Sequence, residues 1–487
     1  MGVMSKFNAT NTRKTVNKSG HAAYSMADKD KLVTMVLTTF FNEGKYYGDN
    51  SNELVELAKW VAVKDPQFVA NLAVYARKEM HLRSVSHVLA SIVARVPESK
   101  PYIAYTVKGV VERADDITEI LACYISMFGK PIPNGLKKAL GKAMNKFNAL
   151  NFSKYNGGNK SIKFRDVLRI CHPKAYSARQ NHTFKMILDD DLPVAKRWET
   201  ELSARGNTKE VWEELIDENK IGYMAALRNL RNMLNVSPRN MYKIYDKLSD
   251  KEEVLSSKQL PFRFLSAYMN LPYGVTSKVR DVLEDACEYS IENLPKLPGK
   301  TVIAIDVSGS MQSCISSKSD ILCSRIAMML GLMANKMCEE AIVYTFDTRL
   351  QELKVSHRSG ILQTTTSSSL WGGGTDLTLP IERMIYDKIE ADRLIMLSDN
   401  EINSGRRGDF KKTCQPLVDM YRREINPNLW VHAIDLQGYG TQQFIGDKTN
   451  IIAGWSERVL EFISLAERGI HSQVDKIQNY HTWNEEL

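Results

Sequence analysis

Hydrophobic and polar positions recur with two different periods along the chain, and the change comes near residue 300. Before it, apolar residues return every three or four positions in short segments, which is the period of amphipathic helices. Polar or proline-containing breaks such as 64–66 and 97–101 separate the segments. Short-linked helices without a strand pattern indicate stacked antiparallel pairs, as in an α-solenoid, although no fixed repeat length is visible. The predicted helices are 53–63, 66–80, 85–96, 102–113, 117–128, 212–218, 223–234, 241–248, 263–269 and 275–294.

After residue 300 the pattern changes to short runs rich in Val and Ile that alternate with helical segments. Such alternation predicts a parallel sheet covered by helices on both faces. The Ser/Thr/Gly-rich stretch 356–374 is predicted to be a loop. The expected strands are 301–306, 341–346, 393–398, 429–435 and 450–453, and the expected helices are 322–338, 377–390, 409–425 and 456–468.

The two patterns predict two folded domains after a flexible basic segment, residues 1–20. An all-α helical-repeat domain is expected at 21–298. An α/β domain of the Rossmann-like class is expected at 299–487. The length of 487 residues fits this division, since it exceeds the usual size of one domain.

Side chains with oxygen atoms lie at or just after the ends of two predicted strands and one predicted loop. Asp306, Ser308 and Ser310 follow the first strand as D-x-S-x-S, Thr375 follows the Gly-rich loop, and Asp399 follows the third strand. Open α/β sheets place their sites at the carboxyl ends of strands. Hard oxygen ligands suit Mg²⁺, which prefers octahedral oxygen coordination. We therefore expect these five residues to bind Mg²⁺ or another divalent cation.

Other uses of the D-x-S-x-S segment are less consistent with its residues. Asp and Ser after a strand are also common turn and helix-capping residues, so this segment alone is weak support. A phosphoryl-aspartate enzyme would need a second carboxylate at Ser308. A serine hydrolase would need the G-x-S-x-G frame, which Ser308 and Ser310 lack. We expect no catalytic residues and no enzyme activity.

Composition favours a cytoplasmic protein. No apolar run reaches the roughly 18 residues of a membrane span, and the first residues are polar and basic, unlike a secretory signal. The seven cysteines are scattered, odd in number and without a C-x-x-C pair. We therefore expect reduced thiols, with neither a disulfide framework nor a zinc site.

Charge divides the chain in the same place as the hydrophobic pattern. Residues 1–300 have 46 basic and 33 acidic side chains, a net charge of +13, whereas 301–487 have 19 and 24, a net charge of −5. Residues 130–185 contain thirteen Lys and Arg but one acid, Asp166. Such a density of positive charge needs a counter-charge, and the phosphates of a nucleic acid are the foremost candidate. An acidic protein is the alternative.

The basic residues of this region are expected to form one binding surface. A helix over 135–150 would bury Leu136, Leu140, Ala143 and Phe147 and present lysines every four positions, which is unfavourable unless an anion meets them. A polar loop, 148–161, and a second basic helix follow. The candidate RNA-binding residues are Lys137, Lys138, Lys142, Lys146, Lys154, Lys160, Lys163, Arg165, Arg169, His172 and Lys174.

Four segments resemble a known family. The stretch 71–83, NLAVYARKEMHLR, resembles a signature of the TROVE module, and 165–174, 226–233 and 260–264 are similar to further TROVE segments. Asp306, Ser308, Ser310, Thr375 and Asp399 together resemble the metal-ion-dependent adhesion site of von Willebrand factor A domains. A TROVE module followed by an A domain is the architecture of the Ro ribonucleoprotein autoantigen family, including its bacterial or phage-type relatives.

The resemblance implies a HEAT-like helical ring whose ends are joined by the A domain. It implies RNA quality control: small structured Y-like RNAs bound on the outer surface, and single-stranded 3′ ends of misfolded RNAs threaded through the hole. Arg77, Lys78, His81 and Arg83 could reach the inner wall, or could form an ordinary solvated helix end. The A domain would dock a protein partner, such as a ribonuclease, at its metal.

One position departs from the family. Phe164 stands where Ro proteins have a histidine that helps to bind Y RNA. Phenylalanine can stack on a base but cannot donate a hydrogen bond. Two hypotheses remain: a non-enzymatic RNA-binding ring of the Ro type, and a protein-adhesion scaffold. In the scaffold the A domain would bind a carboxylate-bearing partner and the basic surface an acidic protein.

Overall fold

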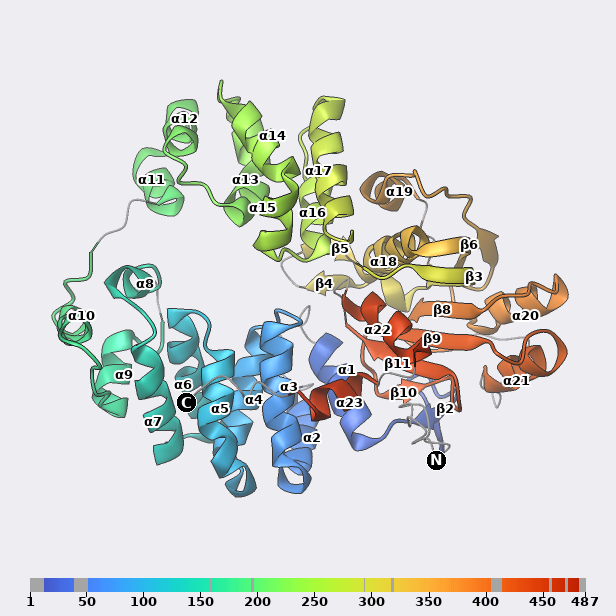
Figure 1. The fold of residues 1–487 in the computed structure, drawn as a ribbon, viewed down its shortest axis with the longest axis horizontal. Helices are drawn as coiled ribbons and strands as arrows, with labels where there is room; N and C mark the ends of the chain where they lie inside the picture. The colour runs from blue at the N-terminus through green and yellow to red at the C-terminus, as the bar shows by residue number, and fades with distance from the viewer. Residues whose placement is uncertain are drawn as a thin grey trace. The chain divides into compact units, whose positions relative to one another are not determined.

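The chain folds into two compact units, each containing residues from both ends of the sequence. The computed structural model describes residues 13–38, 51–157, 160–193, 197–292, 294–316, 319–368, 370, 372–403, 414–454, 458–468 and 472–480. We call residues 27–195 with 473–487 the helical unit, and residues 1–26 with 196–472 the sheet unit. The order of their elements can be followed in Figure 1.

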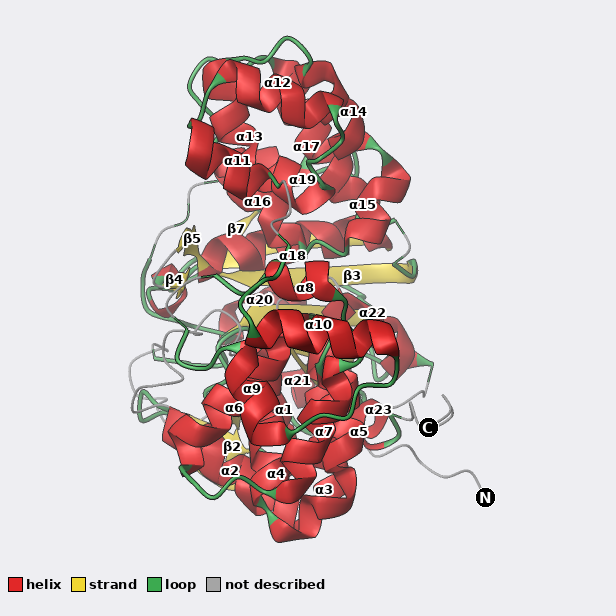
Figure 2. Ribbon diagram, turned by 90° about the vertical axis from the view of Figure 1, so that its left-hand side faces the viewer, coloured by secondary structure: helices red, strands yellow, loops and turns green. Residues whose placement is uncertain are grey.

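The helical unit contains the first series of predicted helices. Its elements are α1 (Asp28–Thr38), α2 (Ser51–Lys64), α3 (Pro66–Lys78), α4 (Ser84–Arg95), the 3₁₀ turn η2 (Pro97–Tyr102), α5 (Ile103–Val110), α6 (Ala114–Phe128), α7 (Asn134–Met144), α8 (Ala149–Ser153), α9 (Phe164–Cys171), α10 (Ala178–Leu188) and α23 (Gln473–Gln478). Helices account for most of its chain, as Figure 2 shows. The helical prediction for this region is confirmed.

Helix α3 illustrates how local sequence and packing agree. Asp65 accepts a hydrogen bond from the amide of Phe68 at 3.0 Å, and Pro66 occupies the first helical position, where its missing N–H costs nothing. Helix α3 packs against α4 and α5. At Gly109 in α5, an added Cβ would lie 2.6 Å from the side chain of Val74, so glycine allows α5 to approach α3 closely. The start of α3 is therefore encoded locally, and its close approach to α5 depends on the glycine at position 109.

The C-terminal helix α23 packs on α3, a contact that the sequence did not suggest. The buried Asn71 side-chain amide donates to the carbonyl oxygens of Ile477 at 3.0 Å and Gln478 at 3.2 Å. The ring of Tyr480 meets Tyr75 edge-on at 5.6 Å, and its hydroxyl donates to Glu79. Residues about 400 positions apart in sequence thus complete one core.

Two predictions in the basic region are wrong. The helix expected at 135–150 ends at Met144, although Leu136, Leu140 and Ala143 are buried as expected. The segment expected to be a polar loop at 148–161 contains α8, whose N-cap Asn148 accepts a hydrogen bond from the Asn151 amide. Asn148 favours starting a new helix over continuing the preceding one, because its side chain competes for backbone donors.

The sheet unit contains a second group of helices, which precede its central sheet in the sequence: α11 (Trp198–Arg205), α12 (Lys209–Asp217), α13 (Tyr223–Val236), α14 (Met241–Ser249), α15 (Lys251–Ser257), α16 (Pro261–Met269) and α17 (Ser277–Tyr289). The boundary between the compact units lies at residues 195 and 196, among the helices.

A six-stranded sheet forms the centre of this unit. Its strands are β3 (Leu297–Asp306), β6 (Cys338–Phe346), β7 (Leu350–Glu352), β8 (Arg393–Ser398), β9 (Trp430–Asp435) and β11 (Thr449–Ala453), in the order β11-β9-β8-β3-β6-β7. Helices α18 (Cys323–Met337), α20 (Thr378–Tyr386), α21 (Gln415–Glu424) and α22 (Arg458–Glu467) connect or flank them. The predicted strands are all present, and the expected helix at 409–425 lies partly outside the described residues.

Alternate residues of β3 point to opposite layers of helices. Val302 and Ala304 belong to a core that also contains Ile381 of α20 and Tyr421 of α21. On the other face, Ile305 lies so close to α18 that a Cβ at Gly331 would meet it at 2.5 Å. Burial on both faces explains the nearly continuous apolar sequence of the strand.

The sheet unit differs from the prediction in three respects. Strand β7 pairs antiparallel with β6, so the sheet is mixed. The stretch 356–374 is not all loop, because it contains α19 (Ile361–Ser367) with Ile361, Leu362 and Thr365 buried. Two small sheets were also missed, namely β1 (Lys14–Val16) with β2 (Ala22–Ser25) and β10 (Thr441–Gln442), and β4 (Cys314–Ser316) with β5 (Ser319–Leu322). Their strands are too short to give a period-two signal.

Among the described helices, none has both the length and the apolar character needed to cross a bilayer. The seven cysteines are free in this structure.

Candidate functional site

The five expected metal ligands come from neighbouring parts of one sheet edge. Asp306 is the last residue of β3, and Ser308 and Ser310 follow it. Asp399 follows β8, which pairs with β3 in parallel, and Thr375 precedes α20. Because both strands end at the same edge, the two carboxylates lie side by side. Asp306, Ser308, Thr375 and Asp399 are fully buried.

Hydrogen bonds hold these side chains in place. One oxygen of Asp306 accepts from the Ser308 amide at 2.9 Å, and the other accepts from the Ser398 hydroxyl at 2.7 Å. The hydroxyls of Ser308 and Ser310 are 3.2 Å apart. Asp399 accepts from the Glu401 amide at 3.1 Å. Protein contacts therefore orient the side chains of Asp306, Ser308, Ser310 and Asp399.

The loops that carry these residues are tied to one another. The Gly309 amide donates to the Gly373 carbonyl at 2.7 Å, and the Thr375 amide donates to the side-chain oxygen of Asn403 at 2.6 Å. A Cβ at Gly373 would lie 2.9 Å from Asp347 Oδ2. The glycines of the 372–374 stretch thus allow Thr375 to approach the strand ends closely.

Burial dominates the electrostatics of this edge. It raises the pKa of Asp306, against the hydrogen bonds from Ser308 and Ser398 that lower it. It also raises the pKa of Asp399 strongly, and the nearby charge of Asp306 adds to that rise. Two buried carboxylates without a cation repel each other and favour protonation. A bound divalent cation would reverse this preference.

The donor set fits a hard divalent cation. Among the described residues, Thr375 Oγ1 and Asp399 Oδ2 are buried oxygens without a hydrogen-bond partner. Buried oxygens of this kind need a donor, a water molecule or a metal. The described residues contain no group of three or more His, Cys, Asp or Glu that could bind a metal. Here two carboxylates are combined with three hydroxyls, a set that suits Mg²⁺ coordinated partly through water.

Two residues that orient the site were not selected from the sequence. Ser398 immediately precedes Asp399, so its position at a strand end was a usable signal. Asn403 lies farther along, and only the folded loop brings it to Thr375. The buried Glu401 accepts from the backbone amides of Lys18 at 3.3 Å and Ser19 at 3.1 Å, so the N-terminal hairpin is attached to the loop that carries Asp399.

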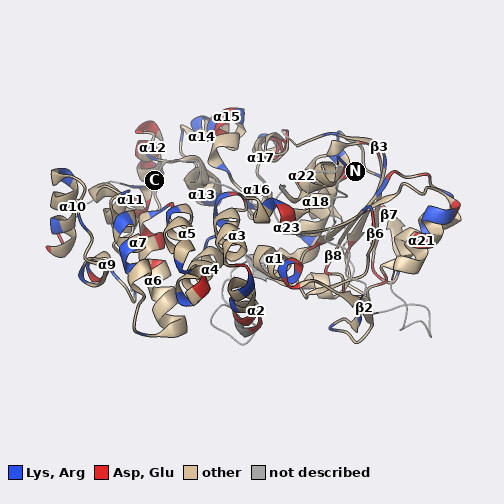
Figure 3. Ribbon diagram, turned by 60° about the horizontal axis from the view of Figure 1, so that its bottom comes forward, with Lys and Arg blue, Asp and Glu red and all other residues tan. Residues whose placement is uncertain are grey.

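The candidate RNA-binding residues lie on a group of packed helices in the helical unit. Helix α7 contacts α9, and a Cβ at Gly141 of α7 would lie in ordinary van der Waals contact with Pro173, at 3.4 Å. The exposed candidates are Lys138, Lys142, Lys146, Lys154, Lys163, Arg169, His172 and Lys174, and the half-buried ones are Lys137, Lys160 and Arg165. Figure 3 shows the basic positions along α7.

Lys146 does not continue the lysine stripe of α7 as expected. It lies beyond the last helical residue, Met144, and its ammonium donates to the carbonyls of Lys108 at 2.7 Å and Val111 at 3.2 Å. The residue as a whole is exposed, but desolvation of its ammonium, together with the charges of Lys78 and Lys108, lowers its pKa. The Lys146 ammonium is therefore bound by backbone carbonyls of the protein itself. Lys138 and Lys142, in contrast, form no ion pair with any described residue.

Phe164 is not available to stack on a base. It is 1% exposed and packs edge-on against Phe152 at 4.9 Å. The half-buried Tyr155 is already covered by the guanidinium of Arg113, 4.5 Å from its ring centre. Tyr176, which was not selected from the sequence, is better placed. Tyr176 is 67% exposed between Lys174 and Arg179.

Arg77 and Arg83 form a buried ion network, which was neither of the roles expected for them. Asp116, with no exposed surface, accepts from Arg77 at 3.1 Å and from Arg83 at 2.7 Å. It also lies 3.0 Å from His87 Nε2. Burial alone would raise the pKa of Asp116, but the bond to His87 and the two arginines hold it well below its usual range. These arginines therefore stabilise the contacts of α3, α4 and α6.

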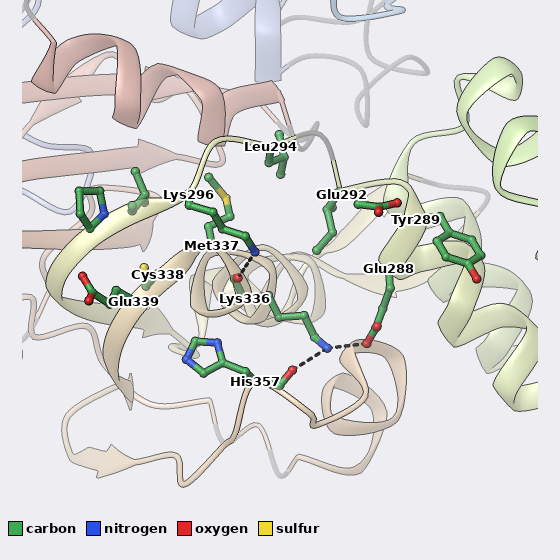
Figure 4. A pocket seen from close by; sticks show the side chains of 13 residues that line it. Glu288, Tyr289, Glu292, Leu294, Lys296, Lys336, Met337, Cys338, Glu339 and His357 are labelled. Atoms are coloured by element: carbon green, nitrogen blue, oxygen red, sulfur yellow. Dashed lines mark hydrogen bonds and ion pairs between the residues drawn. The ribbon is translucent and has the colours of Figure 1, made fainter.

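A large pocket in the sheet unit lies at the opposite end of β3 from Asp306. It has a volume of about 820 Å³ and is bordered by the end of α17, the start of β3 and the junction of α18 with β6. Figure 4 shows that Lys336 binds Glu288 and the His357 carbonyl, and that Lys296 binds the Lys336 carbonyl. Both lysines of the pocket are thus bound by groups of the protein itself.

Comparisons with known proteins agree with this architecture. The TROVE domain model matches residues 22–191 and 190–278, more than half of the chain, and the Ro60 vWA domain model matches 300–434. The crystal structure of the Ro (RSR) protein of Deinococcus radiodurans has a TM-score of 0.60 at 16% identity and covers 91% of this chain and 100% of that one. This structure supports the predicted fold class of helices followed by an A domain.

Curated relatives match over shorter lengths. The RNA-binding protein RO60 of Caenorhabditis elegans is 28% identical over 42% of this chain and 34% of its own length. That of Deinococcus radiodurans is 24% identical over 50% of this chain and 54% of its own. Telomerase protein component 1 of Rattus norvegicus is 24% identical over 44% of this chain, which is 11% of that protein. The chain thus spans about half or less of these relatives, and it belongs to the TROVE domain family.

Proposed function

We propose that the chain is a non-enzymatic RNA-binding protein of the Ro type. The basic surface of α7 and α9 would bind small structured Y-like RNAs, and the protein would also hold single-stranded ends of misfolded RNAs. Relatives named RNA-binding protein RO60 support this proposal. We place the protein in the cytoplasm, because its cysteines are free.

The main support is a set of cations without counter-charge. Lys138 and Lys142 are exposed one turn apart on α7, and Arg169 is exposed on the adjoining α9. None of the three forms an ion pair in the part of the chain that the structure describes. Like charges one turn apart destabilise a helix slightly, so this arrangement favours an anionic partner. A polyphosphate backbone supplies such charges at regular spacing.

The A domain would dock a protein partner through a divalent cation. Asp306, Ser308, Ser310, Thr375 and Asp399 would hold Mg²⁺ or a similar ion, which would supply a Lewis-acidic position for a carboxylate or another oxygen of the partner. The free oxygens of Thr375 and Asp399 support this assignment. A ribonuclease is one class of partner that would join RNA capture to RNA degradation.

The test of RNA binding compares two pairs of lysines. In the first variant Lys138 and Lys142 are both replaced by Ala. In the control Lys243 and Lys247 are replaced, which have the same spacing on α14 but pair with Asp217 and Glu253. Log affinity for a hairpin RNA should fall linearly with log salt, with a slope of roughly 0.7 to 0.9 per phosphate neutralised.

The two pairs should differ in this slope. Replacing Lys138 and Lys142 should reduce its magnitude by about 1.5, whereas the control should leave it unchanged. Equal slopes for both variants would show that the RNA-binding surface does not include α7. A hairpin with a 3′ overhang of about ten nucleotides should also bind more tightly than the same hairpin trimmed blunt, because unpaired bases expose edges that a protein can contact.

The protein-adhesion scaffold is the alternative, and the same buried hydroxyl and carboxylate oxygens would favour it. It predicts that purified protein has no nuclease-sensitive absorbance at 260 nm. It also predicts that an acidic protein, and not RNA, is displaced by the Lys138 and Lys142 substitutions.

A further inference from the structure

The loop that follows β8, residues 399–403, connects two of the candidate metal ligands. It begins with Asp399, whose carboxylate accepts from the Glu401 amide at 3.1 Å. At the other end, the Asn403 side chain accepts from the Thr375 amide at 2.6 Å, and the Asn403 amide donates to the Thr375 carbonyl at 3.2 Å. Asp399 and Thr375 supply the two buried oxygens of the site that have no hydrogen-bond partner among the described residues. The conformation of this loop therefore sets the separation of these two oxygens.

The 399–403 loop has no helix or strand of its own. Asn400 has a φ of 59°, in the left-handed region that asparagine tolerates better than most residues. The side chains of Asp399, Asn400, Glu401 and Ile402 are all buried. Buried polar groups outside a helix or a sheet need partners elsewhere in the protein. The shape of the loop therefore depends on the segments that contact it.

The N-terminal hairpin, residues 14–25, supplies several of these contacts. The Asn17 side-chain amide, 4% exposed, donates to the Ile402 carbonyl at 2.9 Å. The backbone amides of the next two residues donate to the Glu401 carboxylate at 3.3 and 3.1 Å. A buried carboxylate without donors is unfavourable. Without the hairpin, Glu401 would have to move toward water and would displace the loop.

The hairpin is held to the sheet unit on its other side as well. Strand β2 pairs antiparallel with β10 (Figure 1). The Gln443 side-chain amide donates to the Ala22 carbonyl at 3.1 Å. Met26, directly after β2, lies in the hydrophobic core that also contains Ile402. The hairpin is therefore a fixed support against which the 399–403 loop is placed.

We propose that the N-terminal hairpin positions the cation site through the 399–403 loop, so that attachment of the hairpin and binding of the cation are coupled. Asn17 and Glu401 are positioning residues, since neither is a candidate ligand. Mg²⁺ requires nearly ideal octahedral geometry, so a small displacement of Thr375 or Asp399 weakens its binding. The inference rests on the proposed metal-dependent docking. It adds that this docking depends on a segment from the opposite end of the chain.

The test compares two asparagines of the sheet unit that form the same pair of hydrogen bonds. Asn17 accepts from an amide of its own turn at 2.8 Å and donates to the Ile402 carbonyl at 2.9 Å. Asn426 accepts from the amide two positions later at 2.9 Å and donates to the Ala391 carbonyl at 2.9 Å. Ala391 precedes β8, so this second contact lies at the opposite end of that strand from the 399–403 loop. Asn426→Ala is therefore a matched control for Asn17→Ala.

The two variants should differ in cation affinity, measured by calorimetric titration of the full-length protein with Mg²⁺ alone. Asn17→Ala should weaken Mg²⁺ binding about tenfold, within the usual range of coupling between two sites. Asn426→Ala should change it by less than about twofold, as for an independent site. Both should lower the melting temperature in EDTA, because each substitution removes two hydrogen bonds. Equal Mg²⁺ affinities for the two variants would overturn the proposal.

Calcium separates positioning from a general loss of structure. Ca²⁺ accepts longer and more flexible coordination than Mg²⁺. Asn17→Ala should therefore weaken Ca²⁺ binding by a smaller factor than Mg²⁺ binding. The same factor for both cations would contradict the positioning role.

Hydrogen exchange tests the coupling in the unsubstituted protein, even if Asn17→Ala does not fold. Coupling between two sites is reciprocal, so saturating Mg²⁺ should slow exchange of the Lys18 and Ser19 amides, which donate to Glu401, about tenfold. Unchanged exchange of these amides would refute the coupling. The same amides in Asp306→Ala should not respond to Mg²⁺, and a response that persists there would assign the effect to Mg²⁺ bound elsewhere and would also refute it.

Two failures can be distinguished. If the unsubstituted protein binds Mg²⁺ and Asn17→Ala binds it equally well, the positioning role is refuted and the proposed metal site stands. If the unsubstituted protein binds no Mg²⁺, both are refuted.

Discussion

Replacing the buried Asp116 by Asn should destabilise the core of the helical unit. Its carboxylate accepts hydrogen bonds from Arg77, Arg83 and the backbone amides of Glu112 and Arg113, at distances between 2.7 and 3.1 Å. Burial lowers the pKa of His87, so its imidazole is neutral at neutral pH and donates its Nε2–H to Asp116. Asparagine preserves the shape but removes the charge that both arginines face.

The expected loss of stability depends on the ion pairs that each arginine keeps in the Asp116→Asn variant. Breaking a buried ion pair by removing one partner costs about 3–5 kcal/mol. Arg77 keeps Glu112 at 3.1 Å, and Arg83 keeps Asp115 at 2.7 Å. The loss in free energy of unfolding should therefore lie near the lower end of this range, at about 3 kcal/mol. This corresponds to a change of about 100-fold in an opening equilibrium.

Hydrogen exchange is the appropriate assay, because a chain with two compact units need not unfold in one step. Amides in α3, α4 and α6 should exchange about 100-fold faster in Asp116→Asn. The control is Glu119→Gln, a substitution at a half-buried position of the same helix, where the carboxylate forms only a long ion pair of 3.9 Å with Lys160. Its effect should stay within about 0.5 kcal/mol.

The pH dependence supplies a second check. The pKa of Asp116 is depressed in the folded state, so its contribution is present above its ordinary pKa of 3.8 and is lost as the pH falls below that value. The difference between the unsubstituted protein and Asp116→Asn should therefore shrink in acid below about pH 4. A difference of less than about fivefold at pH 7 would refute the view that this network stabilises the helical core.

Three further predictions concern the sheet edge and Lys146. Burial raises the pKa of Asp435, the last residue of β9, from 3.8 to about 6. The folded sheet unit therefore holds a proton that the unfolded chain releases, and in EDTA its stability should fall as the pH rises from about 4 to 6. Melting temperatures that rise over this range would contradict this prediction. Asp306→Ala should abolish stabilisation of the sheet unit by Mg²⁺ while RNA affinity persists, and identical melting of the unsubstituted protein in Mg²⁺ and EDTA would exclude a working metal site. Lys146→Ala should lower the melting temperature of the helical unit, because the Lys146 ammonium binds two backbone carbonyls. The salt slope of RNA binding should stay nearly unchanged. A slope change equal to that of Lys138→Ala would show that Lys146 contacts phosphate.

The sequence by itself determined the features that depend on local periodicity and on residue type. Strand β8 was predicted with its observed bounds, Arg393–Ser398, because a run that is buried on both faces is apolar throughout. The candidate metal ligands Asp306 and Asp399 could be predicted to lie together because parallel strands end at one edge of the sheet. The separation of helical from α/β sequence near residue 300 was equally local.

Tertiary structure decided where individual charges and aromatic rings are used. Arg77, Arg83 and Lys146 looked like candidates for solvent or RNA, and Phe164 like a stacking platform, because a sequence does not show which side chain meets a distant partner. Asp116, the Lys108 carbonyl and Phe152 are those partners. The same holds for α23, whose contact with Asn71 joins residues about 400 positions apart. Such contacts depend on how helices pack in space, and the packing is not encoded in any one segment.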